Sequence, residues 1–209
     1  MGRDHRADPE AKQKGWWHAY GLKLAGYPAL EADAAVVYDY EFGLVPGLLQ
    51  TADYARALFR GFRPQRTEAE LDHHVQLRLF RQRRLTEDPL LELVAIVDET
   101  VLRRPIGGVE VMRAQLRHLV NQAALPSVCF QVVPVSAGAH QGVNGSFSVL
   151  DFADPNEPAV AYTENAVSAT YMHKEAEVRK YKLLFDQLRS EALSPRDSVA
   201  LVEQLAADL

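Results

Sequence analysis

The feature that most constrains the fold is a pair of apolar, β-branched runs separated by one amphipathic helix. The runs "LLELVAIV" (90–97) and "SVCFQVVP" (127–134) are typical of buried strands. Between them, "GGVEVMRAQLRHLVNQAA" (107–124) places its apolar residues on one side of a helix. Two neighbouring strands joined by a helix are parallel by default, with a right-handed crossover. The centre of the chain is therefore expected to form a β-α-β unit.

Two further strands follow this unit. "SFSVLDF" (146–152) and "AVAYTE" (159–164) are separated by the short turn "DPNE", which predicts an antiparallel hairpin. We therefore expect an α+β fold, in which a mixed sheet of about four strands is covered by N-terminal and C-terminal helices. The expected layout is a flexible arm (1–14) and a single domain (15–209) with a helical part (15–88), a β-α-β-β-β core (89–165) and C-terminal helices (170–209).

The helical part is predicted from spacing and capping residues. "PALEADAAVVYDYEF" (28–42) has apolar residues at helical spacing, and the Pro-Gly of "VPGLLQ" ends that pattern. Thr51 is a good N-cap for a helix over 52–60. Thr67 and Glu70 match the capping box of the next helix. A similar Ser-Pro-x-Asp start, "SPRD", opens the last helix of the chain.

The helix that begins near Thr67 ends in a cluster of arginines: Arg78, Arg81, Arg83 and Arg84. Such a cluster could contact phosphate groups. The chain is acidic, however, with a formal net charge of -5. A solvated helix face is therefore the preferred interpretation of these arginines.

Composition and short motifs exclude several classes of protein. The only cysteine among the 209 residues is Cys129, so neither an intramolecular disulfide nor a cysteine zinc site can form. The acidic balance argues against direct nucleic-acid binding. No apolar run is long enough for a membrane span or a signal peptide, so we expect a soluble cytoplasmic protein. The chain has no GxGxxG, GxxxxGK[ST], HExxH or CxxC motif, and we expect no cofactor and no metal.

The expected topology gathers polar residues at one edge of the sheet. If the third strand runs back against the second, it begins where the parallel strands end, and the fourth strand ends there too. Ligands favour the carboxyl ends of parallel strands. The residues that should converge at this edge, and that could act in acid–base catalysis if the protein is an enzyme, are Asp98, Glu99, His140 and Glu164, with Asn144 nearby.

Each of these residues also has a structural interpretation. Asp98 and Glu99 could instead cap the following turn and pair with Arg103 or Arg104, which is the favoured alternative. His140 lies on the Gly-rich loop "SAGAHQGVNG", which could be a lid over a binding site or a simple exposed loop. The sequence leaves both alternatives open.

A second set of residues is predicted to bind a ligand through polar side chains. Gln50 lies just before the N-cap Thr51, where its amide could orient a ligand or satisfy backbone groups left open by the Pro-Gly break. The predicted ligand-binding residues are Glu41, Gln50, Tyr54, Asn144 and Asn165.

Several long runs, in this order and spacing, carry a resemblance to a known family. They are "GWWHAY", "YEFGLVPGLLQTADYARAL", "DETVLRRPIGG", "LPSVCFQVVPVSAGAH", "FSVLDFADPNEP" and "ALSPRDS". Over Gly15 to Leu209 the chain resembles the C-terminal domain of unknown function in bacterial, antitoxin-like regulators of the XRE helix-turn-helix family. In that family the helix-turn-helix reads DNA, and this domain is thought to sense a small molecule or a small partner protein.

The chain departs from the family pattern in two ways. The residues before Gly15 are too few for a helix-turn-helix, so either this sequence is a trimmed piece of a longer protein or the protein works alone. The start "MGRDHRADPEAK" favours a stand-alone protein. "HQGVNGSF" and "YTENAVS" also differ from the usual runs at the expected edge, around Asn144, Asn165 and Ser168. Such changes would suit a new ligand or a new chemistry.

Three functions are compatible with these observations. The first is an effector-sensing domain that binds a small molecule, with a homodimer as a possible assembly. The second is a cofactor-independent cyclase, isomerase or hydrolase acting on a natural-product intermediate. The third is a protein–protein interaction module, which would present an exposed apolar patch.

Overall fold

The structure is a computed structural model, and it describes residues 26–209. The elements of its first half are α1 (Tyr27–Asp33), β1 (Ala34–Glu41), the 3-10 helix η3 (Gly47–Leu49), α2 (Ala52–Phe62), α3 (Glu68–Gln82), the 3-10 helix η4 (Arg83–Leu85), β2 (Glu92–Asp98) and α4 (Glu99–Arg103). The second half contains α5 (Val109–Gln122), β3 (Val128–Val133), the 3-10 helices η5 (Val135–Ala137) and η6 (Gln141–Asn144), β4 (Phe147–Phe152), β5 (Val160–Glu164), β6 (Ala169–Met172), α6 (Glu175–Glu191) and α7 (Pro195–Asp208).

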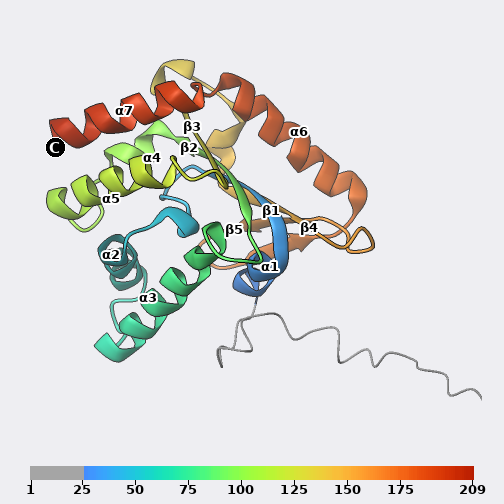
Figure 1. Cartoon of the computed structure of the whole chain (residues 1–209), viewed down its shortest axis with the longest axis horizontal. Coiled ribbons are helices and arrows are strands. Elements are labelled where there is room, and N and C mark those ends of the chain that lie inside the picture. Colours follow the sequence, from blue (N-terminus) through green and yellow to red (C-terminus); the bar gives the residue numbers. More distant parts are fainter. Residues whose placement is uncertain (1–25) are drawn as a thin grey trace, which may run out of the picture.

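These elements form one mixed sheet with helices on both faces (Figure 1). The strand order is β3-β2-β1-β4-β5-β6. Strands β1, β2 and β3 are parallel to one another, and the β1–β4, β4–β5 and β5–β6 pairs are antiparallel. The predicted parallel pair and the predicted hairpin are both confirmed, as is the α+β class.

The predicted helix over 28–42 is wrong in its second half. The helix ends at Asp33, and Ala34–Glu41 is β1, which lies between β2 and β4 in the sheet. Because β1 is covered on both faces, its burial does not alternate cleanly and its sequence lacks the usual strand pattern. Hydrogen bonding to a strand on each side outweighs the local helical spacing.

The expectation of about four strands is also corrected, to six. β1 lies in the part expected to be helical, and β6 lies at the start of the part assigned to C-terminal helices. β4 pairs with β1 and not with β3. In the strand order, β1 lies between β2 and β4, and β3 is at the edge of the sheet. The polar ends of the strands still meet at one edge, since β4 is antiparallel to β1 and β1 is parallel to β2.

The two faces of the sheet have separate apolar cores. On one face, Val37 and Leu150 belong to a cluster that includes Tyr54 of α2, Leu116 of α5 and Val202 of α7. We call this the α5 face. On the other face, Tyr40, Ile96 and Phe147 pack against Val178 and Phe185 of α6, and we call this the α6 face. Figure 1 shows α6 across the strands from α2, α3 and α5.

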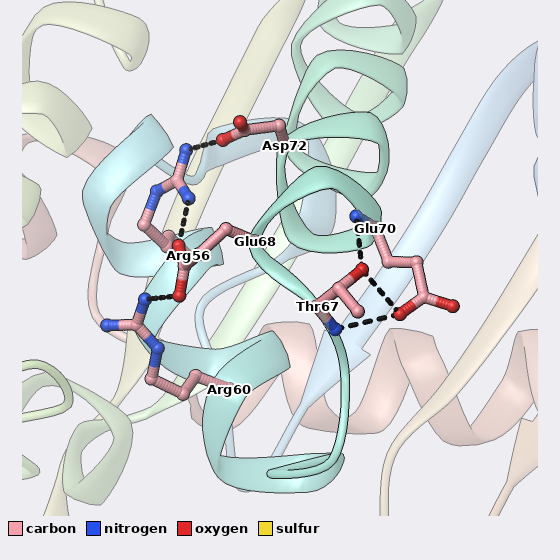
Figure 2. A network of polar contacts seen from close by, with 6 residues as sticks. All are labelled: Arg56, Arg60, Thr67, Glu68, Glu70 and Asp72. Atoms are coloured by element: carbon pink, nitrogen blue, oxygen red, sulfur yellow. Dashed lines mark hydrogen bonds and ion pairs between the residues drawn. The ribbon is translucent and has the colours of Figure 1, made fainter.

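The predicted helix starts are confirmed. The Thr51 side chain accepts a hydrogen bond from the backbone N–H of Tyr54, and Ser194 caps α7 in the same way. Thr67 and Glu70 form the complete capping box of α3 (Figure 2). Beside it, Arg56 and Arg60 of α2 form ion pairs with Glu68 and Asp72 of α3, which join the two helices on their exposed sides (Figure 2).

The interpretation of the arginine cluster as a solvated face is wrong for Arg81 and Arg84, which are buried, and Arg78 is only partly exposed. Arg81 is 8% exposed and binds the carboxylate of Glu31 through two hydrogen bonds of 2.7 and 2.6 Å. Arg84 is 4% exposed and donates to backbone carbonyls that include those of Ala32 and Ala34. Buried guanidinium groups need such partners. These two arginines therefore fix the α1–β1 connection against the end of α3.

None of the helices within residues 26–209 is both long enough and apolar enough to cross a membrane. The proposed arm over 1–14 and the aromatic run "GWWHAY" lie outside the residues that the structure describes.

Candidate functional site

The carboxyl ends of β1, β2 and β3 lie at one edge of the sheet, as do the start of β4 and the end of β5. We call this edge the rim. A loop of residues 134–146 connects β3 to β4 along it. Because side chains alternate between faces along each strand, the rim residues divide into a group on the α5 face and a group on the α6 face. Both groups contain buried ionisable side chains.

The group on the α5 face is centred on β1. Asp39 accepts a hydrogen bond of 2.8 Å from the Ser148 hydroxyl, and Glu41 accepts one of 2.7 Å from the Ser146 hydroxyl. At the end of β5, Tyr162 donates a hydrogen bond of 2.7 Å to Glu164. We call this group the β1 polar cluster, with the members Asp39, Glu41, Ser146, Ser148, Tyr162 and Glu164.

The two carboxylates of β1 have strongly perturbed pKa values. Burial, and then the charge of Asp39, raises the pKa of Glu41 to about 8. Burial also raises the pKa of Asp39 to about 6, although the hydrogen bond from Ser148 opposes this change. Of the ion pairs formed within residues 26–209, none involves either carboxylate. A protonated Glu41 near neutral pH can donate a hydrogen bond as well as accept one.

Arg78 is the cation that lies near this cluster without a carboxylate bound to it. Its Nη1 donates to Oε1 of Gln50 at 3.2 Å, and its guanidinium lies 5.2 Å from the centre of the Phe59 ring. Its Nε is buried and has no hydrogen-bond partner among the described residues. Burial, and then the charge of Arg81, lowers the pKa of Arg78 to about 10. Arg78 therefore still carries its charge at neutral pH, but this is a single positive charge beside two carboxylates.

The group on the α6 face is a buried pair formed by His140 of the loop 134–146 and Asp98 at the end of β2. Nε2 of His140 lies 3.2 Å from Oδ2 of Asp98, and the two side chains are 4% and 8% exposed. Oδ1 of Asp98 also caps α4 by accepting a 2.9 Å hydrogen bond from the Thr100 N–H. The Tyr40 ring lies edge-on to the His140 ring, with the ring centres 6.5 Å apart. We call Tyr40, Asp98 and His140 the loop-covered cluster.

Glu99 contributes to the structure of the rim. Its Oε1 accepts two hydrogen bonds from Arg103, of 2.8 and 2.5 Å, and its Oε2 accepts one of 2.9 Å from the Val135 N–H. The sequence alternative, in which Asp98 caps a turn and Glu99 pairs with an arginine, is therefore present in the structure. For Asp98 the contact with His140 is present as well.

The Gln50 amide is used within the protein. Its Nε2 donates to the Val45 carbonyl at 2.7 Å and its Oε1 accepts from Arg78, with only 1% of the residue exposed. Nε2 of Gln82 donates to the Gln50 carbonyl at 2.7 Å. Gln115 donates to the Leu49 carbonyl and accepts from the Thr51 N–H, also at 2.7 Å each. The turn "VPGLLQT" is therefore held by three buried or half-buried amides, which satisfy backbone groups left open by the Pro-Gly break.

The remaining predicted residues, Tyr54, Asn144 and Asn165, form no hydrogen bond to either cluster among the described residues. Tyr54 is fully buried, and its hydroxyl accepts a hydrogen bond of 3.2 Å from the Val45 N–H. Asn144 is exposed and donates to the carbonyl of Gln141 within its own 3-10 turn. Asn165 forms the β5–β6 turn by accepting hydrogen bonds from the N–H groups of Val167 and Ser168. All three side chains make contacts that support local structure.

The chain matches a known protein family over most of its length. A family model described as "Domain of unknown function (DUF5753)" matches residues 24–204. The chain belongs to the DUF5753 family. No curated protein and no solved structure matches it significantly.

In this DUF5753 domain, sequence reasoning missed several residues of both clusters. Asp39 was placed on a helix, although its position two residues before Glu41 would have put both carboxylates on one face of a strand. Tyr40 was missed for the same reason. Ser146 and Ser148 also have this period of two, and Ser148 lies opposite Asp39 in the β1–β4 pair.

The described part of the DUF5753 domain, residues 26–209, contains no group of three or more His, Cys, Asp or Glu side chains arranged to hold a metal ion. Two hollows lie on its surface away from both clusters. One is on the outer side of α3 and is lined by His73, Gln76, Leu77, Leu79, Phe80 and Arg83. The other lies between α5 and α7. Neither gathers ionisable groups as the rim does, so the rim is the better candidate site.

Proposed function

We propose that the chain is the effector-sensing domain of a regulator lineage and binds a small molecule at the β1 polar cluster. The observation that supports this most strongly is Glu41, a half-buried carboxylate at a strand end that forms no ion pair within residues 26–209. Keeping a carboxyl group in that position costs stability. A ligand that donates hydrogen bonds or carries a positive charge would recover this cost. Perturbed carboxylates of this kind concentrate at functional sites.

The resemblance to XRE helix-turn-helix regulators supports the same proposal. In that family the homologous domain is attached to a DNA reader, which gives a bound ligand something to control. The proposed ligand would be a bacterial metabolite, and the protein would act in the cytoplasm. It would bind the metabolite and not DNA.

The test is mass spectrometry of a metabolite extract incubated with the purified chain. Both the extract and the material retained by the protein are measured. We expect one compound to be retained unchanged by the wild type and by Glu157→Gln, an exposed control. Glu41→Gln keeps the size and the hydrogen bond from Ser146 but cannot become charged, so retention of a cationic ligand should fall at least tenfold. Equal retention by all three proteins would remove the β1 polar cluster from the proposal.

A second candidate function is cofactor-independent acid–base catalysis. The specific observation is the contact of His140 with Asp98, because a carboxylate that orients an imidazole is a recurrent arrangement for a general base. In the same extract, catalysis would consume a compound well beyond one equivalent. His140→Gln should stop that consumption while leaving retention at the β1 polar cluster unchanged.

A further inference from the structure

Two buried polar atoms of the loop-covered cluster have no hydrogen-bond partner among the described residues. They are the hydroxyl oxygen of Tyr40, whose residue is 0% exposed, and Nδ1 of His140, whose side chain is 4% exposed. Leaving such groups unpaired in a protein interior is energetically costly, because each gives up its hydrogen bonds to water without replacing them. They lie on adjacent rings, one on β1 and the other on the loop 134–146. Two unsatisfied groups in one small region point to a shared partner.

The contact with Asp98 determines what each atom can do. A carboxylate only accepts hydrogen bonds, so Nε2 of a neutral His140 must carry the ring proton and donate it to Asp98. Nδ1 is then the unprotonated nitrogen and needs a donor. Burial, and then the charge of Asp98, raises the pKa of the Tyr40 hydroxyl, so it keeps its proton and needs an acceptor. With His140 neutral, the missing partner must both donate a hydrogen to Nδ1 and accept one from the Tyr40 hydroxyl.

We propose that the loop-covered cluster is a binding site for a single hydroxyl group, contributed by an alcohol or by water. The hydroxyl donates its hydrogen to Nδ1 of His140, and its oxygen accepts the hydrogen of the Tyr40 hydroxyl. Asp98 stabilises the imidazole in the tautomer that accepts. This arrangement polarises the bound O–H bond towards His140, which is the arrangement a general base requires.

The loop 134–146 controls access to this site. It is attached at the rim by three carboxylates: Glu99 holds the Val135 N–H, Asp98 holds His140, and Glu41 holds the Ser146 hydroxyl. Its Gly142 is seated directly against the hydroxyl end of the Tyr40 ring. An alcohol is larger than water, so it must enter while this loop is displaced.

The inference is tested with methanol as the probe and acetonitrile as the control, because acetonitrile is of similar size and accepts but cannot donate. The readout is the ¹⁵N resonance of His140 Nδ1 in histidine-labelled protein, assigned by its loss in His140→Gln. We expect methanol to produce a saturable shift that acetonitrile does not produce. Tyr40→Phe should weaken methanol binding about three- to tenfold, the usual effect of losing one uncharged hydrogen bond.

Tyr38→Phe is the matched control, since Tyr38 lies on the same strand and face but packs on Phe185. It should leave methanol binding unchanged. The inference is overturned if methanol gives no saturable shift, if acetonitrile gives the same shift, or if Tyr40→Phe behaves like the wild type. None of these outcomes requires a ligand to bind at the β1 polar cluster, whose carboxylates lie on the other face of the sheet.

Discussion

Ser146 and Glu41, 105 residues apart in the chain, are joined by a hydrogen bond of 2.7 Å at the rim of the sheet. The Ser146 hydroxyl also accepts a hydrogen bond of 3.0 Å from the Phe42 N–H. This single side chain therefore connects the end of β1 to the start of β4 and holds one end of the loop 134–146. Burial raises the pKa of Glu41, and the same hydrogen bond from Ser146 lowers it by less.

The first prediction concerns stability against pH. The pKa of Glu41 is raised to about 8 in the folded chain and returns to its ordinary value near 4.5 on unfolding. The folded state then binds more protons than the unfolded state, so stability is full below the ordinary pKa and falls as the pH rises towards 8. The slope from this group is at most about 1.4 kcal/mol per pH unit.

Urea unfolding at a series of pH values between these limits checks this prediction. Glu41→Gln should flatten the profile relative to the wild type, whereas the exposed variant Glu157→Gln should keep its slope. Parallel profiles for wild type and Glu41→Gln would show that Glu41 has an ordinary pKa in the folded chain.

The second prediction concerns Gln50. Gln50→Ala leaves the Val45 carbonyl and the Arg78 guanidinium without their buried partner. Each such loss costs roughly 1–3 kcal/mol, so the free energy of unfolding should fall by that order. Chemical denaturation measures it, with the exposed Gln76→Ala on α3 as control. A variant as stable as the wild type would mean that the amide has no structural role and is free for a ligand.

The third prediction concerns the buried ion pair of Glu31 and Arg81, whose side chains are 4% and 9% exposed. Glu31→Gln leaves the Arg81 charge buried without compensation, and breaking a buried pair in this way costs about 3–5 kcal/mol. Glu87→Gln removes an exposed pair with Arg83 and should change the free energy of unfolding little. Similar effects for the two variants would indicate that solvent reaches Arg81.

The fourth prediction concerns Gly142, which lies in η6 with an ordinary helical backbone. A Cβ at this position would overlap the Tyr40 ring. Gly142→Ala should therefore cost about 1–3 kcal/mol of stability, the usual effect of overpacking. It should also speed amide hydrogen exchange in residues 135–146. Gly43→Ala, where a Cβ meets nothing within 4 Å, is the control and should change neither quantity.

Part of the candidate site was predictable from the sequence. Asp98, Glu99 and His140 were placed at one edge because each follows a recognisable strand, and the direction of a β-α-β unit follows from its connection. Glu164 was placed there because a short turn requires an antiparallel hairpin. These inferences need only local patterns and the handedness of the chain.

The partner relationships of the site were not predictable. Whether His140 meets Asp98 or solvent depends on how the loop 134–146 lies over the rim, and that depends on contacts with residues distant in sequence. The interpretation of Arg81 and Arg84 as solvent-exposed is wrong for the same reason, since they bind Glu31 and the backbone of α1 only in the folded chain.

By itself, the sequence determined the helix starts at Thr51, Thr67 and Ser194, the parallel pair β2–β3 and the β4–β5 hairpin, because capping residues, β-branched runs and short turns act within a few residues. Only the tertiary structure decided that Ala34–Glu41 is a strand at the centre of the sheet. That segment is compatible with a helix locally, and it becomes a strand because β2 and β4 hydrogen-bond to its two edges while apolar cores cover both of its faces. The same insertion placed Asp39 and Glu41 at the rim on one face and Tyr40 on the other, which created both candidate clusters.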